Sequence, residues 1–190
     1  MSILVTGGAR SGKSTFAEKL CMTLAPEAIY IATAQAYDDE MRERIALHTM
    51  ERSQADYTWT TVEEPIRLPE LLQEWGNIDR SNGDKAPTIM VDCLTIWLTN
   101  VLLSIDEQQD VAQKVKDEIQ RLVEQVASYP GHIILVTNEV GDGIVPEYPL
   151  GRLYRDLAGF MNQAMARICS QVFLVTVGIP IELKSLEYKL

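Results

Sequence analysis

The stretch Ile3-Leu4-Val5-Thr6-Gly7-Gly8-Ala9-Arg10-Ser11-Gly12-Lys13-Ser14 decides the fold of this chain. It joins a short, continuously apolar run to a glycine-rich turn, and helical spacing follows from Ser14 to Leu24. A continuous apolar run is typical of a strand that is covered on both faces, as in a parallel sheet. Glycines let the backbone of the turn adopt conformations that other residues rarely reach. We therefore expect a strand, a tight turn and a helix, in that order.

The turn from Gly7 to Ser14 fits the phosphate-binding pattern G-x-x-x-x-G-K-[ST], the P-loop. Consecutive amide N–H groups of such a turn converge on phosphate oxygens at the amino end of a helix. Lys13 would reach the β- and γ-phosphates of a nucleotide, and Ser14 would place its hydroxyl on Mg²⁺. The candidate phosphate-binding residues are Gly7, Gly8, Ala9, Arg10, Ser11, Gly12, Lys13 and Ser14. The alternative is a glycine-rich strand–helix turn that binds no ligand.

Strand-like and helix-like segments alternate along the rest of the chain. Further short apolar runs lie at residues 28–31, 89–91, 133–136 and 172–175. Helical spacing runs from Val111 to Val126 and from Leu150 to Ile168. This alternation predicts an α/β fold with right-handed crossovers. Together with the P-loop it predicts a P-loop NTPase-type three-layer sandwich, a mostly parallel sheet flanked by helices. The length of 190 residues predicts one domain, over residues 1–190.

Charge and composition exclude several classes of protein. The chain has 17 Lys and Arg against 27 Asp and Glu, a net charge of −10. That charge repels phosphate backbones and anionic lipid, so we expect neither a nucleic-acid partner nor membrane binding. No apolar stretch reaches the roughly 18 residues of a membrane span, and no signal peptide is evident. Cys21, Cys93 and Cys169 follow no disulfide or zinc pattern. We expect a cytoplasmic protein with reduced, buried thiols.

Polar residues follow several of the predicted strands. Asp92 ends the apolar strand Thr88-Ile-Met-Val-Asp92, the usual position of a second magnesium ligand in P-loop proteins. The other polar residues at strand ends are Thr33, Gln35, Glu63, Asn138 and Glu139. Ligands of open α/β sheets bind outside the carboxyl ends of the strands, so these groups are candidates for one site. Each has an alternative as a turn or helix-capping residue.

Beyond the P-loop, further segments stand in a characteristic order: Tyr30-Ile-Ala-Thr-Ala-Gln35, Trp59 to Glu63, Val91-Asp-Cys-Leu-Thr95 and Val136-Thr-Asn-Glu-Val-Gly141. With them, nearly the whole chain resembles the bifunctional adenosylcobinamide kinase and adenosylcobinamide-phosphate guanylyltransferase family of cobalamin assembly. The chain departs from that family at Ser53, where a proline is usual, at Asp142, and at Ser170-Gln171.

The resemblance implies two reactions. An NTP phosphorylates adenosylcobinamide, and GTP then donates GMP to that phosphate, giving adenosylcobinamide-GDP and pyrophosphate. In the family a histidine carries the GMP covalently, and His48 stands at the matching position. The other histidine, His132, opens an apolar strand, which indicates a structural position. The alternatives are a P-loop small-molecule kinase in which His48 is idle, and a non-catalytic nucleotide-binding module.

The resemblance also implies which residues meet the nucleotide. Besides the P-loop and Asp92, these are Thr33, Ala34, Gln35, Arg52 and Glu63. The carboxylate of Glu63 would accept the N1–H and N2–H groups of guanine. The implied ligands are GTP, ATP and Mg²⁺, with Ser14 and Asp92 on the metal and His48 and Lys13 in catalysis. The implied assembly is a homotrimer. Whether ATP or GTP feeds the kinase step, and whether one nucleotide pocket or two serve the reactions, is left open.

Overall fold

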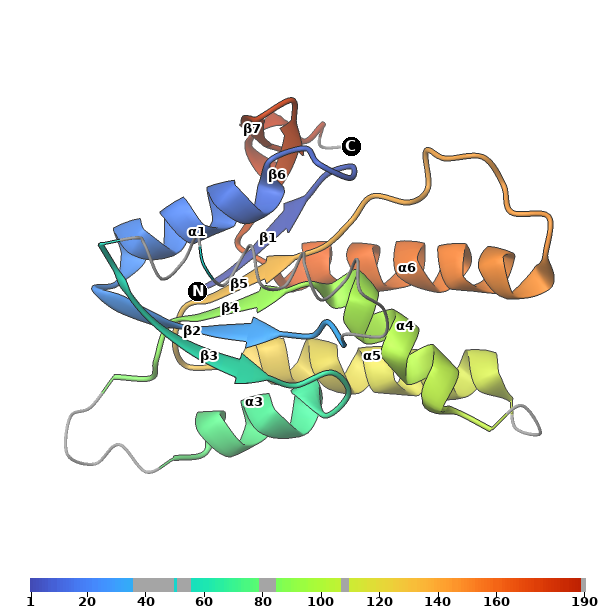
Figure 1. Ribbon diagram of the computed structural model, residues 1–190, viewed down its shortest axis with the longest axis horizontal. Helices are drawn as coiled ribbons and strands as arrows, with labels where there is room; N and C mark the ends of the chain where they lie inside the picture. Colours follow the sequence, from blue (N-terminus) through green and yellow to red (C-terminus); the bar gives the residue numbers. More distant parts are fainter. Residues whose placement is uncertain (36–49, 51–55, 79–84, 107–109, 189–190) are drawn as a thin grey trace.

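The computed structural model describes residues 1–35, 50, 56–78, 85–106 and 110–188 (Figure 1). Its strands form one seven-stranded sheet of order β3-β2-β4-β5-β1-β6-β7. The strands are β1 Ser2–Thr6, β2 Glu27–Ala32, β3 Thr58–Glu63, β4 Ile89–Asp92, β5 Ile133–Val136, β6 Gln171–Thr176 and β7 Ile179–Glu182. The helices are α1 Lys13–Leu24, α3 Leu68–Gly76, α4 Leu94–Ser104, α5 Val111–Ser128, α6 Pro149–Ile168 and the 3₁₀ helix η1 Lys184–Leu186.

The sheet is parallel from β3 to β6, and only β7 pairs antiparallel, with β6. Helix α1 covers one face, and α3, α4, α5 and α6 lie on the other (Figure 1). The predicted three-layer sandwich is thereby confirmed. None of the helices in the described part of the chain is long and apolar enough to cross a membrane.

The apolar runs are continuous because both faces of the sheet are covered. On β1, Ile3 and Val5 pack with Ala17 of α1, whereas Leu4 packs on the opposite face with α5 and α6. Successive side chains of a strand point to opposite faces, so each residue of a doubly covered strand must be apolar. Ile3, Leu4 and Val5 are each at most 2% exposed.

The structure adds two helices that the sequence pattern does not predict, α3 and α4. Seven of the residues of α4 are buried, including Trp97, Leu98 and Asn100. A helix that is buried on most of its sides has no polar stripe, so the helical period is hidden in its sequence. Helix α3 is short and starts with Leu68 and Pro69, which gives its period little length to appear in.

Candidate active site

One row of residues crosses the sheet at the carboxyl ends of its strands. Val5 pairs with Val136, Val136 with Asp92, Asp92 with Ala32, and Ala32 with Glu63. Neighbouring strands lie about 4.8 Å apart, so Asp92 is about 10 Å and Glu63 about 19 Å from Val5 along the row. The P-loop begins two residues after Val5. The sheet therefore brings the P-loop, Asp92 and Glu63 to the carboxyl ends of its strands. Asp92 lies nearer to the P-loop strand β1 than Glu63 does.

The backbone of the P-loop requires glycine at two positions. Gly12, which caps α1, has φ of 91°, in the left-handed region that other residues rarely adopt. A Cβ on Gly7 would lie 2.4 Å from the carbonyl oxygen of Val175 on β6. The turn is therefore built against the neighbouring strand, with no room for a side chain at Gly7.

The P-loop carries positive charge at the amino end of α1. The Lys13 ammonium donates to the Gly8 carbonyl oxygen over 3.1 Å, and Lys13 is only 8% exposed. The first turn of α1 contains no acidic residue. The unpaired amide groups and the dipole of a helix amino end attract anions. Lys13 and the amino end of α1 together concentrate positive potential inside a protein of strongly negative net charge, and phosphate binding by these residues stays a prediction.

Two other segments hold the P-loop from its sides. The Gly178 amide, in the turn between β6 and β7, donates to the Ser11 carbonyl oxygen over 2.8 Å. The Glu139 amide, which follows β5, donates to the Gly7 carbonyl oxygen over 3.1 Å. These bonds fix the loop on a frame of three strands, β1, β5 and β6, before any ligand binds.

The carboxylate of Asp92 is half-buried beyond β4 and accepts a hydrogen bond of 3.1 Å from the Tyr30 hydroxyl. Next to it, burial raises the pKa of the Cys93 thiol, the charge of Asp92 adds to this, and the Lys13 charge acts in the opposite direction. Lys13 therefore lies near enough to the end of β4 for its charge to act on Cys93.

Thr33 is fully buried, and its hydroxyl ties the end of β2 to the end of β4. It donates to the Cys93 carbonyl oxygen over 2.8 Å and accepts from the Cys93 amide over 2.9 Å. The side-chain amide of Asn100 donates to the Thr33 carbonyl oxygen over 2.9 Å. The Thr33 side chain thus orders this edge of the sheet, and contact between Thr33 and a nucleotide stays a prediction.

A network of polar side chains lies next to the carboxyl ends of β4 and β5. The sequence analysis did not predict that these side chains contact one another. Asn138 donates to the Thr95 hydroxyl over 2.9 Å, and Tyr154 of α6 donates to the Thr95 carbonyl oxygen over 3.0 Å. Asn162 of α6 donates to the Asn138 carbonyl oxygen and accepts from the Thr137 hydroxyl. These contacts fasten the first turn of α4 and the segment after β5 to α6. The sequence signal for these contacts would have been polar residues at helical spacing on the otherwise apolar face of α6.

Of the remaining sequence-predicted site residues, two fall outside the described part of the chain and four are described. His48 and Arg52 lie outside the residues that the structure describes. Arg10 is exposed in the P-loop, and Glu63 is exposed at the end of the edge strand β3. Ala34 and Gln35 follow β2 directly and are half-buried.

His132 lies at the amino end of the central strand β5, on the side of the sheet away from the P-loop. It precedes β5 and lines a cavity of about 630 Å³ with Lys85, Thr88 and Glu27. The four residues of β5 separate it from the P-loop edge by about 13 Å at 3.3 Å per residue. This position agrees with the structural role that the sequence indicates for His132.

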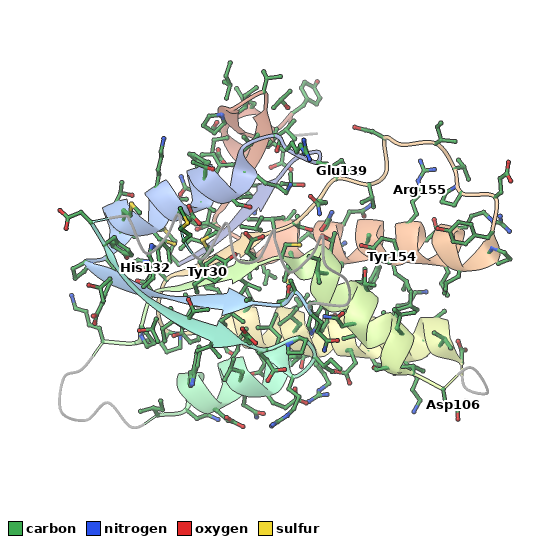
Figure 2. The ribbon with its side chains drawn as sticks, in the orientation of Figure 1. Tyr30, Asp106, His132, Glu139, Tyr154 and Arg155 are labelled. Atoms are coloured by element: carbon green, nitrogen blue, oxygen red, sulfur yellow. The ribbon has the colours of Figure 1, made fainter. Side chains whose placement is uncertain are left out.

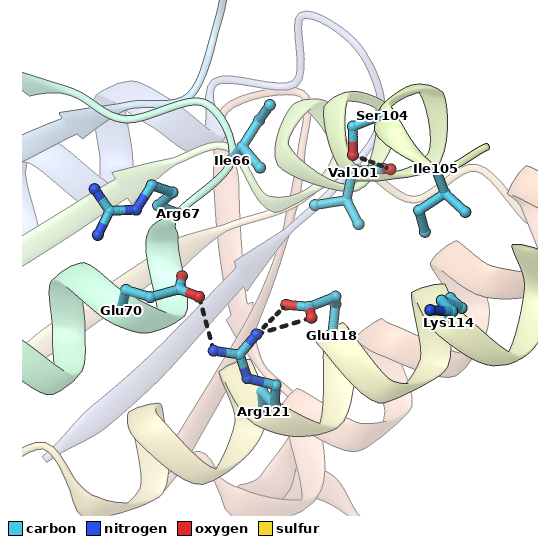
Figure 3. A pocket seen from close by; sticks show the side chains of 9 residues that line it. All are labelled: Ile66, Arg67, Glu70, Val101, Ser104, Ile105, Lys114, Glu118 and Arg121. Atoms are coloured by element: carbon cyan, nitrogen blue, oxygen red, sulfur yellow. Dashed lines mark hydrogen bonds and ion pairs between the residues drawn. The ribbon is translucent and has the colours of Figure 1, made fainter.

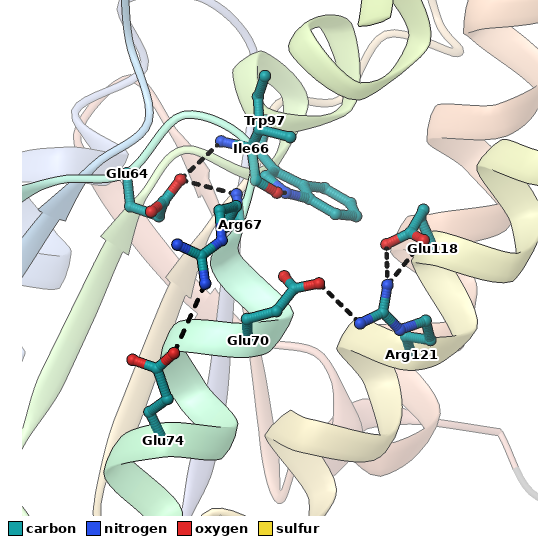
Figure 4. Close-up of polar contacts among 8 residues, drawn as sticks. All are labelled: Glu64, Ile66, Arg67, Glu70, Glu74, Trp97, Glu118 and Arg121. Atoms are coloured by element: carbon teal, nitrogen blue, oxygen red, sulfur yellow. Dashed lines mark hydrogen bonds and ion pairs between the residues drawn. The ribbon is translucent and has the colours of Figure 1, made fainter. Parts of the chain in front are cut away.

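A second cavity of about 250 Å³ lies between α3, α4 and α5 (Figure 3). On its rim, Arg121 contacts Glu70 at 2.7 Å and Glu118 at 2.8 Å, joining α3 to α5 (Figure 4). Burial is the largest single influence on the pKa of Glu70 and opposes its ionisation. The hydrogen bond from Arg121, a backbone hydrogen bond and the charges of Arg121 and Arg67 together outweigh burial, so the pKa of Glu70 is lowered. No residue of the P-loop lines this cavity, so we do not count it as part of the site.

The parallel sheet, the P-loop after β1 and the acidic residue after β4 define a P-loop nucleotide-binding protein. Solved structures agree on the fold. An ATPase of the type III secretion system of enteropathogenic Escherichia coli, EscN, aligns with a TM-score of 0.56 and 16% identity over 93% of this chain and 43% of that chain. A prototypical ATPase from a type III secretion system aligns with a TM-score of 0.50 and 15% identity over 95% of this chain and 56% of that chain.

Sequence relatives identify the family. Residues 3–183 match the family described as cobinamide kinase / cobinamide phosphate guanyltransferase. The bifunctional adenosylcobalamin biosynthesis protein CobP of Pseudomonas aeruginosa is 44% identical over 97% of this chain and 98% of its own length. The protein CobU of Salmonella typhimurium, of the same description, is 41% identical over 97% of this chain and its full length. The chain belongs to the cobinamide kinase / cobinamide phosphate guanyltransferase family.

Membership confirms the main functional prediction. The chain is an enzyme of this family, with the kinase and the guanylyltransferase activity that the family description names. It uses a nucleotide and acts on a corrinoid. A simple P-loop kinase and a non-catalytic nucleotide-binding module are not favoured.

Proposed function

We propose that the carboxyl edge of the sheet binds the nucleoside triphosphate, with its phosphates on residues 7–14. The observation that carries this proposal is the P-loop itself, a glycine-dependent turn that holds the Lys13 ammonium at the amino end of α1. In the kinase step, the hydroxyl of the aminopropanol arm of adenosylcobinamide attacks the γ-phosphorus. The bond from that phosphorus to the β,γ-bridging oxygen breaks, and the nucleoside diphosphate leaves. Lys13 stabilises the charge that develops on the phosphate oxygens.

The residues present fit Mg²⁺. This ion is usually held by one or two carboxylates together with substrate phosphates and water. Asp92 supplies one half-buried carboxylate at the site edge, and Ser14 supplies a hydroxyl in the first turn of α1. When bound, Mg²⁺ neutralises phosphate charge. Tyr30, through its bond to Asp92, fixes the direction of that carboxylate.

For the second step we propose His48 as the nucleophile. A neutral imidazole is abundant at pH 7, because its ordinary pKa is about 6.5. Its nitrogen forms a bond to the α-phosphorus of GTP as pyrophosphate leaves. An oxygen of adenosylcobinamide phosphate then attacks the same phosphorus and releases His48. Such covalent catalysis splits one displacement into two easier ones. The family resemblance supports this role, as does the position of His132, the other histidine, at the amino end of β5, away from the P-loop.

The proposed nucleotide contacts beyond the P-loop follow the register row. Glu63 lies about 19 Å from Val5 by strand spacing, too far to meet phosphates on the P-loop. It is exposed, and its carboxylate suits the N1–H and N2–H groups of guanine, which adenine does not offer as a pair. We add Thr33, Ala34, Gln35 and Arg52 as contacts on the strength of the family resemblance.

We further propose that residues 1–190 form one domain, that the protein works in the cytoplasm and that it assembles as a homotrimer. GTP serves the guanylyl step, and either ATP or GTP serves the kinase step. The family resemblance supports these statements, and the single continuous sheet supports the single domain.

One labelling experiment tests the role of His48. The protein is incubated with Mg²⁺ and GTP labelled at the α-phosphate, and the denatured chain is analysed for covalent label. We expect a label that is stable to alkali and lost in acid, absent from His48→Ala and retained in the matched control His132→Gln. Label that persists in His48→Ala, or none in the unmodified protein, would contradict the proposal.

A further inference from the structure

We propose that Glu139 is the catalytic base of the kinase step, the group that takes the proton from the corrinoid hydroxyl. This inference rests on the proposed function, because it concerns the same P-loop site. Glu139 follows β5, and β5 lies between β1 and β4 in the sheet. It therefore emerges between the P-loop and Asp92, where a substrate would approach the end of a bound triphosphate.

The backbone of Glu139 is bonded directly to the P-loop. The Glu139 amide donates to the Gly7 carbonyl oxygen over 3.1 Å. The carbonyl oxygen of Gly8, which follows Gly7 in the P-loop, accepts from the Lys13 ammonium over 3.1 Å. The P-loop lysine reaches the β- and γ-phosphates. Lys13 and Glu139 are thus anchored to adjacent residues of one turn, Gly8 and Gly7. Figure 2 shows Glu139 beside this turn.

The carboxylate is held in place by its own loop. Oε1 of Glu139 accepts a hydrogen bond of 2.6 Å from the Gly141 amide, and Arg155 of α6 donates to the Gly141 carbonyl oxygen. The Glu139 side chain is exposed, so a substrate can reach it. Within the described ranges, no hydrogen bond to Oε2 is found, so we propose this oxygen as the one that meets the substrate hydroxyl.

The two carboxylates of the register row, Asp92 and Glu63, are less suited to accept the proton of the corrinoid hydroxyl. Asp92 accepts from Tyr30 and stands two strands from β1, in the position that fits the metal. Glu63 stands four strands from β1, about 19 Å away. Glu139 lies three residues beyond Val136 of this row, and unlike Asp92 and Glu63 it is hydrogen-bonded to the P-loop through its backbone amide.

The hydroxyl oxygen of the corrinoid arm forms a bond to the γ-phosphorus, and its proton passes to Oε2 of Glu139. The bond from the γ-phosphorus to the bridging oxygen breaks, and its electron pair leaves with the nucleoside diphosphate. The guanylyl step needs no such base, because its acceptor is a phosphate that is already anionic at pH 7. Glu139 therefore matters for one reaction and not for the other.

The test compares the two reactions in Glu139→Gln. Glutamine keeps an oxygen for the Gly141 amide, so the loop retains its bond, but it cannot take a proton. Kinase turnover is measured with adenosylcobinamide and ATP by formation of ADP. Guanylyl transfer is measured with preformed adenosylcobinamide phosphate and GTP by release of pyrophosphate. Loss of a general base costs about a hundredfold or more in kcat. We expect that loss in the kinase reaction, with guanylyl transfer within about twofold of the unmodified protein.

Two further variants sharpen the test. Glu147→Gln removes an exposed carboxylate from the same loop and should leave both reactions unchanged. Glu139→Ala should recover part of its kinase activity when formate is added, because a free carboxylate can replace the missing base, whereas a purely structural defect is not rescued.

Equal loss of both reactions in Glu139→Gln, or kinase activity within threefold of the unmodified protein, would overturn the role of Glu139 alone. An unmodified protein that performs neither reaction would overturn the proposed function, and this inference with it.

Discussion

The lysine of the P-loop stands out among individual residues because it is a nearly buried cation. Lys13 is 8% exposed and is held over the turn by the Gly8 carbonyl oxygen. Burial of an ammonium group costs free energy, and the surrounding amide groups favour a phosphate chain as its ligand. We therefore expect Lys13 to serve ligand binding more than the stability of the fold.

Replacement of Lys13 by methionine keeps the length of the side chain and removes the charge. We expect Lys13→Met to lose at least about 1.4 kcal/mol of triphosphate binding, a tenfold change, while its melting temperature stays equal to or above that of the unmodified protein. Calorimetric titration with GTP and thermal unfolding measure the two quantities. Lys19→Met, which removes an exposed lysine from the same helix, should leave both unchanged. Undiminished binding in Lys13→Met would refute this role.

Asn100 joins three segments from inside α4. It is 4% exposed, and its side-chain amide donates to the carbonyl oxygens of Thr33 and Pro65 over 2.9 and 3.0 Å. Asn100→Ala leaves both acceptors without this donor, which costs about 1–3 kcal/mol of unfolding free energy. Urea unfolding measures the loss, with the exposed Asn77→Ala as the control. A change below about 0.5 kcal/mol would mean that water replaces the amide.

At the scale of secondary-structure elements, the sequence predicts best where an element has one buried stripe. The helices predicted from Val111 and Leu150 extend over Val111–Ser128 and Pro149–Ile168 in the structure. Their apolar side chains recur at helical spacing because one face of each packs on the sheet side. The same periodicity does not predict helix α4, because α4 is covered on most sides and has no single apolar stripe.

The end of the sheet is held by one carboxylate, that of Glu182 on β7. It accepts from the amides of Val172, Lys184 and Ser185 over 3.0, 3.2 and 2.6 Å. The hydrogen bond from Val172 is the main cause of a lowered pKa at Glu182. Burial opposes it, and the hydrogen bonds from Ser185 and Lys184 add to the lowering. Since the pKa is lower in the folded state, the contribution of Glu182 is present above the ordinary glutamate pKa and is lost as pH falls through the folded value.

We expect the amide proton of Ser185 to shift upfield as pH is lowered from 6 to 3, with a midpoint below the ordinary glutamate pKa of about 4.3. Two-dimensional NMR follows this shift residue by residue. In Glu182→Gln the shift should disappear, because the acceptor no longer titrates. A midpoint at or above 4.3 in the unmodified protein would contradict the assignment.

At the scale of the whole molecule, the three cysteines report on the integrity of the core. All are buried and free. Burial raises the pKa of Cys21 to about 12 and of Cys169 to about 11, and it raises that of Cys93 as well. Since the thiolate is the reactive form, the native thiols should stay unreactive at pH 8.

A thiol titration with Ellman's reagent checks this expectation. The native protein should react over hours, whereas all three thiols should react within minutes in guanidinium chloride. Rapid reaction of one native thiol would show that part of the core opens easily. Such a result would locate the opening, because Cys21 and Cys93 pack on the α1 face and Cys169 on the other.

The fold class and the P-loop pattern can both be predicted from the amino-acid sequence alone. The P-loop is contiguous, so the glycines, Lys13 and the helix start act together without help from distant residues. The doubly covered strands are equally local, because their continuous apolar runs report burial on both faces. Glu63 and Asp92 were predicted as strand ends for the same reason, although their part in the site rests on the family resemblance.

Only the tertiary structure decided which strand ends meet. The order of the sheet places β5 between β1 and β4, and this brings Glu139 to Gly7 across 132 residues of sequence. His132 lies at the other end of the same strand, away from the P-loop, as its place before that strand in the sequence already implies. Strand order and register are set by packing and hydrogen bonds between segments far apart in the chain, and no local pattern of residue types encodes them.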